Sequence, residues 1–352
     1  MPRLAAAVFG ARARVPTERF RTNIFKRINH FFLFCLLQIL PLYDIRINML
    51  GKSWAKSLYG QKYLLLMSVP FVLWLAVFRY IPIWGWTMAF QDFKAHLGFF
   101  EQTWVGLRYF RELFQSANFY LSLRNTVAMS LIGLTFNTVA ALTFAILLNE
   151  LRFLHFKRFT QTVSYLPHFV SWVVVANIVT SMLALSGPVN DLLVSLRIIR
   201  EPVNWMAKPE YFWWIVGFAD VWKSTGWNAI IYLAAIAGID SQLYEAAQMD
   251  GVNRMQKIWH ITLPGISATI FILLILNIGN LLNIGLERQF LLGNAVTREK
   301  AFVLDWFALD FGIGLFRFSF GTAIGIFRSV VSVLLLFLAN FLAKRAGWPR
   351  LF

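Results

Sequence analysis

The chain has 352 residues, of which 58% are hydrophobic and only 14% are charged, and this composition excludes an ordinary soluble domain. Several apolar stretches reach the length of about 20 residues that a helix needs to cross a bilayer. The formal net charge of +16 has two explanations, which are binding to nucleic acid or basic loops on one side of a membrane. The single cysteine, Cys35, excludes an internal disulfide.

Residues 1–62 form a basic segment that precedes the apolar part of the chain, with 11 Lys or Arg against two acidic residues. The short apolar run 4–11 is followed at once by arginines, which argues against a signal peptide. Residues 28–43 are interrupted by Gln38 and Pro41 and are short for a span. They favour a helix that lies in the membrane interface.

Six apolar stretches after this segment predict an all-α integral membrane protein with about six transmembrane helices. Tryptophans gather near several of the proposed helix ends, which is typical of the membrane interface. We place the spans at residues 63–91, 122–148, 163–185, 212–237, 263–284 and 320–342.

The charges between the spans predict the orientation of the chain. If the N-terminus is cytoplasmic, 19 Lys or Arg and six acidic residues lie inside, in residues 1–62, 149–162, 238–262 and 343–352. Ten basic and ten acidic residues then lie outside, in residues 92–121, 186–211 and 285–319. Because basic residues are enriched on the cytoplasmic side, both termini are expected there. This distribution also explains the net charge without nucleic acid.

Residues 240–264 form a polar stretch between the fourth and fifth predicted spans, on the expected cytoplasmic side. The Glu-Ala-Ala triplet at 245–247 favours a helix, and Gly251 tolerates the backbone of a turn. Residues 252–262 predict a second helical piece, after which Pro264 is typical of the first turn of the next span. A helix–turn–helix at the membrane face suits the docking of a partner outside the bilayer.

The spaced string Glu-Ala-Ala, two residues, Asp-Gly and then Ile-x-Leu-Pro resembles the EAA loop of binding-protein-dependent ABC importer permeases. In that family the loop forms coupling helices that sit in a groove of the cytoplasmic ATPase. Val252, Ile258 and Ala268 depart from common family residues without changing the charge or the turn. The resemblance implies an ATPase-coupling role for Glu245, Ala246, Ala247, Asp250, Gly251, Ile261, Leu263 and Pro264.

The resemblance covers about residues 55–345 and is greatest to the oligosaccharide branch, named for lipoprotein-associated polysaccharide permeases. It implies the type I ABC importer permease fold over residues 63–345, with 346–352 as a cytoplasmic tail. Outside the loop it is carried by residues 148–151, 156–158, 164–172, 220–223, 262–266 and 338–345.

The same resemblance implies partners in a bacterial inner membrane. These are a second homologous permease subunit, two ATPase subunits that bind ATP and Mg, an extracytoplasmic solute-binding protein and membrane lipid. This chain is expected to bind no cofactor and to be a transport subunit, not an enzyme, and its sequence lacks the G-x-x-x-x-G-K-[ST] phosphate loop. The branch imports oligosaccharides, and acidic, alginate-like fragments are the leading expectation, while neutral sugars remain open.

Polar residues in the fourth span are candidates for the translocation path, because ionisable groups inside a membrane are costly. Asp220 and Lys223 lie three residues apart on one helical face and can pair. They either border the path or hold the span against its neighbours. Trp227 suits stacking on a sugar ring, but it also suits packing or the aromatic belt.

Three asparagines, Asn277, Asn280 and Asn283, recur every three residues along the fifth span. A polar stripe in an apolar helix indicates either a helix contact or the lining of a wet pore. Arg288 follows at the expected outer mouth and suits a sugar carboxylate, with a solvated loop charge as the alternative. Arg328, in the outer half of the last span, completes the candidate path.

Two other classes of protein fit this sequence less well. An ion-coupled secondary sugar transporter needs carboxylates at midplane in two related halves, whereas Asp220 is the only acid inside a predicted span. A membrane-embedded glycosyltransferase needs clustered acids or a metal site. The acids are dispersed and the histidines lack metal-ligand spacing, so no metal site is predicted.

Overall fold

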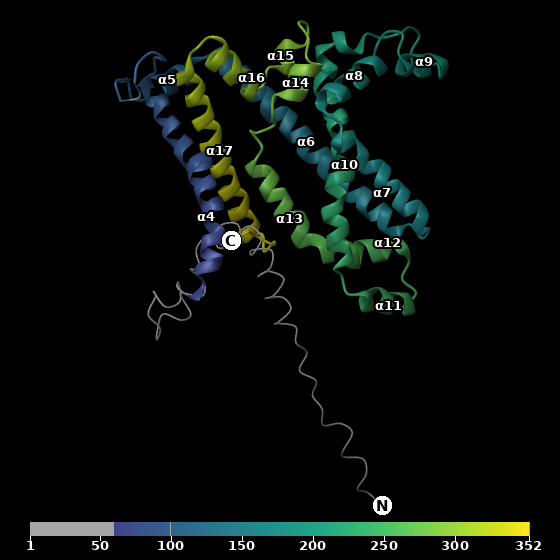
Figure 1. The fold of residues 1–352 in the computed structure, drawn as a ribbon. Coiled ribbons are helices and arrows are strands. Elements are labelled where there is room, and N and C mark those ends of the chain that lie inside the picture. Colours follow the sequence, from purple (N-terminus) through teal and green to yellow (C-terminus); the bar gives the residue numbers. More distant parts are fainter. Residues whose placement is uncertain (1–59, 99, 352) are drawn as a thin grey trace, which may run out of the picture. The chain divides into compact units, whose positions relative to one another are not determined.

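The computed structural model describes residues 60–98 and 100–351, and the chain divides into two units, Met1–Gly85 and Trp86–Phe352 (Figure 1). The predicted interfacial helix at 28–43 lies outside the described residues. Within these residues the chain is helical apart from loops and one short two-stranded hairpin. The predicted all-α class is therefore confirmed.

The described part of the first unit is a single helical segment. It comprises α4 (Lys62–Leu75), the π-helical turn η1 (Ala76–Tyr80) and the start of the 3-10 helix η2 (Ile81–Phe90), which runs on into the second unit. No side chain of α4 or η1 is buried. The segment Lys62–Phe90 is long and apolar enough to cross a membrane, as predicted for the first span.

Four long helices form the frame of the second unit: α6 (Ala117–Glu150), α10 (Pro209–Ala237), α13 (Leu263–Gly279) and α17 (Phe318–Arg345). The helix α10 packs along α6, and α13 packs along α17. The α6–α10 contact is close, because a Cβ added at Gly217 would lie only 2.8 Å from a side-chain carbon of α6. The second, fourth and sixth predicted spans are therefore helices.

The third predicted span, residues 163–185, is not one straight helix. The helices α7 (Leu154–Phe169) and α8 (Trp172–Met182) meet at an angle of 103°. Pro167 lacks the backbone N–H that a continuing helix uses. The Ser171 hydroxyl accepts a hydrogen bond from a backbone N–H of the first turn of α8, so it starts a new helix. Hydropathy alone gave no sign of the bend, because both arms are apolar.

The fifth predicted span, residues 263–284, differs at both ends. The helix begins earlier, with α12 (Arg254–Lys257) and the π-helical turn η4 (Ile258–Thr262), and it runs through Pro264 without a break. It ends at Gly279, five residues before the predicted end. The asparagine stripe therefore does not lie along one helix.

Shorter elements connect the long helices. Figure 1 shows α14, α15, α8 and α9 at one end of the second unit and α11 and α12 at the opposite end. The remaining bounds are β1 (Gln91–Asp92), β2 (Thr103–Trp104), α5 (Arg108–Gln115), α9 (Pro188–Ser195), η3 (Trp205–Ala207), α11 (Ser241–Met249), α14 (Glu287–Leu292), α15 (Arg298–Ala301), α16 (Leu304–Ala308) and η5 (Leu309–Gly314).

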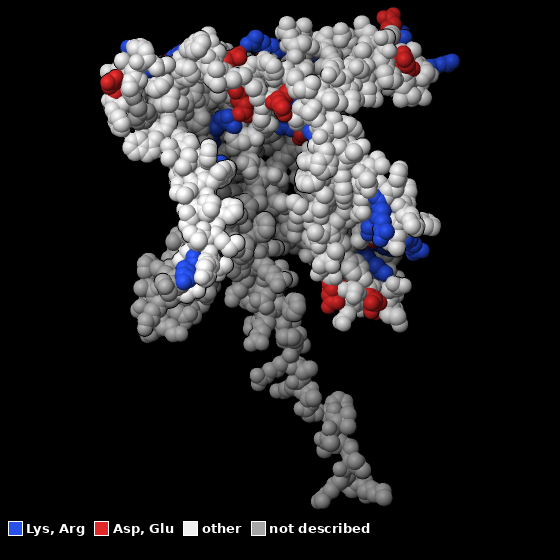
Figure 2. Space-filling model, in the orientation of Figure 1, with Lys and Arg blue, Asp and Glu red and all other residues white. Residues whose placement is uncertain are grey.

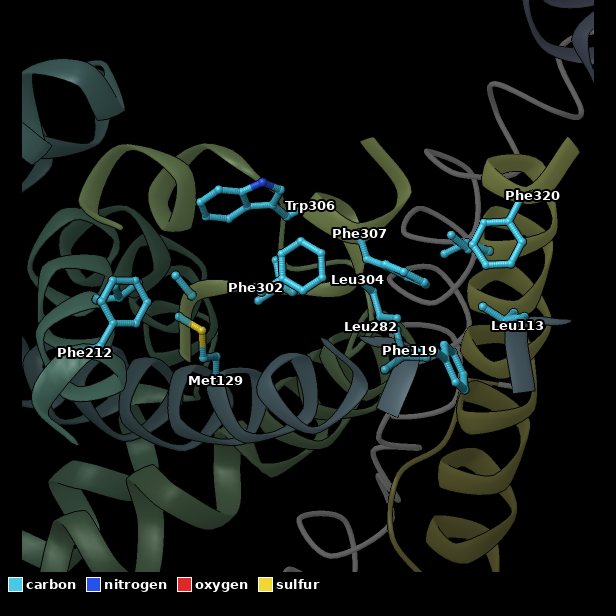
Figure 3. Packing of buried hydrophobic residues seen from close by; sticks show 14 of the residues in the cluster. Leu113, Phe119, Met129, Phe212, Leu282, Phe302, Leu304, Trp306, Phe307 and Phe320 are labelled. Carbon is cyan, nitrogen blue, oxygen red and sulfur yellow. The ribbon is translucent and has the colours of Figure 1, made fainter. Parts of the chain in front are cut away.

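The main buried cluster lies where α6, α10 and α17 meet the short helices α14 to α16 (Figure 3). Phe119, Phe212, Phe307 and Phe320 are almost completely buried. The rings of Phe307 and Phe320 meet edge to face at 5.7 Å, an arrangement that aromatic pairs prefer. This packing fixes the short helices on the frame of long ones.

Several helices along the described residues are long and apolar enough to cross a membrane. Four helices pass a length and hydropathy test for spanning, and the bent α7–α8 pair makes up to five. The 29-residue α10 fails that test despite its length, and it carries Asp220 and Lys223 near its middle. On the face shown in Figure 2, charged side chains of the second unit gather near its two ends, with a largely uncharged stretch between them.

The buried Asn125 of α6 provides a test of this packing. Its amide donates to the carbonyls of Glu299 and Phe302, at 2.6 and 2.9 Å. We expect Asn125→Ala to lower the free energy of unfolding by about 1–3 kcal/mol, because two carbonyls lose their donor. Thermal unfolding in detergent measures this, with the exposed Asn118→Ala on the same helix as the control. Equal melting temperatures for the two variants would contradict a stabilising role for the Asn125 hydrogen bonds.

Candidate functional site

The stretch 240–264 folds as a helix, a tight turn and a second helix. Asp240 caps α11 by accepting a hydrogen bond from the backbone N–H of Gln242. At the other end Gly251 has a φ of +72°, which favours glycine. The N–H groups of Gly251 and Val252 donate to carbonyls of the last turns of α11, which is the Schellman arrangement. The predicted stop at Gly251 is confirmed.

The second helix of this loop has its own start signal. Asn253 and Gln256 exchange hydrogen bonds between side chain and backbone, both at 2.9 Å, and so form a capping box. Pro264 lies in the first turn of α13, as predicted, and α13 directly continues the π-helical turn η4. Such a wide turn accommodates a residue that cannot donate to the helix ladder. The spacing of Asn253 and Gln256 is typical of a capping box, so this start signal is visible in the sequence although it was not predicted.

The loop is held to the long helices by few but specific contacts. The Tyr244 hydroxyl of α11 and the buried Thr262 hydroxyl of η4 lie 2.9 Å apart. Ala247 is buried, and a Cβ added at Gly265 would lie 2.7 Å from the Ile239 side chain. The two helices of the loop therefore form one rigid piece with the start of α13.

The remaining side chains of the loop are free to contact a partner. Of the eight predicted coupling residues, Glu245, Ala246, Asp250, Gly251 and Pro264 are exposed, Ile261 and Leu263 are half-buried and Ala247 is buried. Large apolar side chains beside them are also exposed: Leu243, Met249, Met255 and Trp259. An apolar surface of this kind at the end of a unit marks an interaction site.

Asp220 and Lys223 do not pair with each other, which corrects the predicted contact. Asp220 instead forms an ion pair with Arg288 of α14 at 2.6 Å, and it accepts a hydrogen bond from Asn137 of α6 at 2.8 Å. The side chains of Asp220 and Arg288 are only 15% and 14% exposed. The sequence could not show this pair, because its members lie 68 positions apart.

Lys223 has a different set of partners, at the bend between α7 and α8. Its ammonium donates to the carbonyls of Pro167, His168 and Val170, at 3.2, 2.7 and 2.6 Å. An ammonium has three donors, and each has its own carbonyl here. Lys223 therefore caps the C-terminal end of α7.

Trp227 lies one turn further along α10 and stacks face to face on His168, with ring centroids 4.5 Å apart and planes 3° apart. Its side chain is 42% exposed. His168 thus covers one face of the indole, so a sugar ring could stack only on the other face.

The three asparagines are separated by the end of α13. Asn277 is exposed on the helix, Asn280 is its C-cap, and Asn283 lies in the loop beyond. Asn283 accepts a hydrogen bond from Arg328 at 2.6 Å, and Arg328 also forms an ion pair with Asp305 of α16. The Nε of Arg328 is buried without a hydrogen-bond partner. Arg328 and Asn283 are thus brought together, whereas Asn277 is not part of this network.

Among residues 60–98 and 100–351, no group of three or more His, Cys, Asp or Glu side chains is placed to hold a metal ion. The charged groups described above take part in two Arg–Asp pairs and in the capping of one backbone break.

Comparison with known proteins defines the class. Residues 137–347 match the family described as binding-protein-dependent transport system inner membrane component. Protein LplB of Bacillus subtilis (strain 168) is 40% identical over 86% of this chain and 95% of its own length. The polygalacturonan/rhamnogalacturonan transport system permease protein YteP of the same organism is 42% identical over 83% of this chain and 90% of its own length. The chain belongs to this family of inner-membrane ABC transporter permeases.

Solved structures agree with this assignment. The fold is similar to a chain in the crystal structure of a bacterial ABC transporter involved in the import of the acidic polysaccharide alginate, with a TM-score of 0.75, 36% identity and coverage of 82% of this chain and 98% of that one. A second structure holds a bacterial alginate ABC transporter with an alginate pentasaccharide-bound periplasmic protein, with a TM-score of 0.76, 34% identity and coverage of 85% and 100%. The predicted ABC importer permease fold is confirmed, and the chain is a transport subunit whose ATPase is a separate subunit.

The Asp220–Arg288 pair generates a prediction about stability. We expect Arg288→Met to destabilise the protein by about 3–5 kcal/mol, because it leaves a buried carboxylate without its cation. The double variant Asp220→Asn and Arg288→Met should recover most of this loss, since no buried charge remains. Unfolding midpoints of the two single variants and the double variant measure the coupling. Additive losses would contradict a direct pair.

Proposed function

We propose that this chain is one of two permease subunits of an ATP-driven oligosaccharide importer and that residues 240–264 are its cytoplasmic ATPase-coupling loop. The observation that carries the proposal is the rigid helix–turn–helix at one end of the unit, with exposed apolar side chains on it. The fold similarity to alginate importers supports the same function.

The loop has the properties of a docking surface. Met249 is 89% exposed, and Leu243 and Trp259 are more than half exposed. Carboxylates at Glu245 and Asp250 stand beside them. Buried aromatic or aliphatic anchors with a polar rim carry most of the energy in protein interfaces. The ATPase subunit is the partner we assign to this surface.

The cytoplasmic side follows from charge. The basic residues Lys157, Arg158, Arg254 and Lys257 all belong to segments placed inside by the distribution of Lys and Arg. With this orientation both termini are cytoplasmic, and α14 to α16 face the extracytoplasmic solute-binding protein.

The mechanism is alternating access driven from outside the chain. ATP, bound with Mg in two ATPase subunits, draws these subunits together and moves the coupling loops. The rigid loop passes this movement to α10 and α13, which border it on both sides. The translocation path between the spans then opens outward. Hydrolysis returns it to the inward state. A homologous second permease subunit supplies the other half of the path.

We assign acidic oligosaccharides as the substrate class. The relatives' names include polygalacturonan/rhamnogalacturonan, and the similar structures belong to transporters of the acidic polysaccharide alginate. In this chain the Arg328 side chain is 18% exposed, so part of its guanidinium can meet a sugar carboxylate beside its bond to Asp305. The side chain of Arg288 is engaged by Asp220.

The coupling role is tested on the complex purified through this chain in lipid. We expect Glu245→Lys and Gly251→Pro to strip away the co-purifying ATPase or to abolish its stimulation by substrate-loaded binding protein. The charge reversal disturbs the docking face, and proline cannot adopt the positive φ of Gly251. Asp191→Lys, an exposed charge reversal on α9 at the other end, is the control. If no ATPase co-purifies and uptake persists in both loop variants, the importer assignment is wrong and an ion-coupled transporter replaces it.

The substrate class is tested separately through Arg328. We expect Arg328→Gln to reduce uptake of a uronic acid trisaccharide about tenfold relative to a neutral trisaccharide, the effect of losing one charge-assisted bond. Asp305→Asn breaks the same ion pair but keeps the guanidinium. It should therefore preserve the preference for the acidic over the neutral trisaccharide. Proteoliposome uptake of both sugars gives the ratio. An equal loss of both sugars in the two variants would show that Arg328 is structural only.

A further inference from the structure

The bend between α7 and α8 is joined to α10 by three neighbouring contacts. Lys223 donates to three carbonyls at the bend, and the carbonyl of Val170 lies beyond the last residue of α7. One turn further along α10, Trp227 stacks on His168. Between them, a Cβ added at Gly226 would lie 2.1 Å from the Ser164 carbonyl oxygen, so the two backbones are in direct contact.

The ammonium of Lys223 binds at the point where the α7–α8 pair is broken. A backbone that turns by 103° leaves carbonyls without their helical donors, and such groups are costly away from water. Lys223 is only 8% exposed, and its ammonium also lies 5.8 Å from the ring centre of Trp172, the first residue of α8. Lys223 therefore contacts both arms of the bend.

The other end of α10 runs directly into α11. Only Gly238, Ile239 and the cap Asp240 separate the two helices, and Gly238 and Ile239 donate backbone hydrogen bonds back to α10. Lys223 lies 14 positions before Ala237, which is about 21 Å along a helix. A movement of α11 therefore reaches the bend through one uninterrupted helix.

From these contacts we infer that Lys223 is a positioning residue that ties the bent α7–α8 span to the coupling loop. Movement of α11 turns α10, and the ammonium carries the bend and α8 with it. The helix α8 in turn contacts α14, whose Arg288 pairs with Asp220 of the same α10. The inference rests on the proposed role of residues 240–264 in ATPase coupling, and it adds a structural route from that loop to a broken span.

The test measures whether α8 follows the coupling loop. Spin labels report the distance between the two elements in a Cys35→Ser background, one at the exposed Val173 of α8 and one at the exposed Gln242 of α11, which is not among the proposed docking residues. The complete complex in lipid nanodiscs is measured without nucleotide and after trapping with ATP and vanadate. We expect a narrow distance distribution in both states for the otherwise unaltered protein.

Lys223→Met keeps the unbranched side chain and removes all donors. We expect it to broaden the distance distribution in both states, because the bend is no longer fixed to α10. Sugar-stimulated ATPase activity, measured without vanadate, should fall about tenfold, within the usual range for coupling between sites. Lys223→Arg, which keeps a cation with several donors, should restore a narrow distribution. The control is Lys208→Met, which removes an exposed lysine at the start of the same helix.

Three outcomes overturn the inference: a Lys223→Met distribution as narrow as that of the control, broadening by Lys208→Met as well, or no rescue by arginine. If Lys223→Met does not assemble, Lys223→Gln replaces it; its neutral amide has one donor fewer and one bond less reach, so we expect a smaller broadening. A Lys223→Gln distribution equal to that of the control then overturns the inference. Absence of an ATPase from the unaltered complex would instead refute the proposed function, so the two failures are distinguishable.

Discussion

Backbone groups inside a membrane must find partners within the protein, and the interior of this permease is arranged around that constraint. The α7–α8 bend exposes carbonyls, and the ammonium of Lys223 satisfies three of them. Beyond Gly279 the chain leaves the helix again, and here Ser130 of α6 donates to the carbonyl of Leu281. Polar side chains on continuous helices thus stabilise the points where neighbouring helices are interrupted. These hydrogen bonds fix the geometry of the interruptions.

The same logic explains why α10, despite its length, fails the hydropathy test for a membrane span that the other long helices pass. Asp220 and Lys223 lower its hydropathy, yet each is engaged by a group from another element. A continuous helix that carries two charges is a costly way to cross a membrane unless those charges hold neighbours in place. Lys223 contacts the bent α7–α8 pair and Asp220 contacts the short helix α14, so α10 supports both elements of the second unit.

Sequence reasoning succeeded where the signal is local. Hydropathy placed α6, α10 and α17, and the glycine at 251 marked the turn of the loop, because these features depend on neighbours in the chain. It failed where partners are distant. The pairing of Asp220 with Lys223 satisfied the helical spacing, but Arg288 offers a second charge from α14, and the carbonyls at Pro167 offer Lys223 better partners. Spacing on one helix does not reveal a competing partner on another.

The asparagine stripe shows a related limit. A period of three is the signature of one helix face only if the helix continues, and α13 ends at Gly279. A Cβ at Gly279 would lie 3.0 Å from Leu336 of α17, so close packing selects glycine where the helix ends. Beyond this point Asn283 lies in a loop, free of the helical period, and bonds to Arg328 and Ser332 of α17. The contact with α17, and not the helical period, therefore sets the position of Asn283.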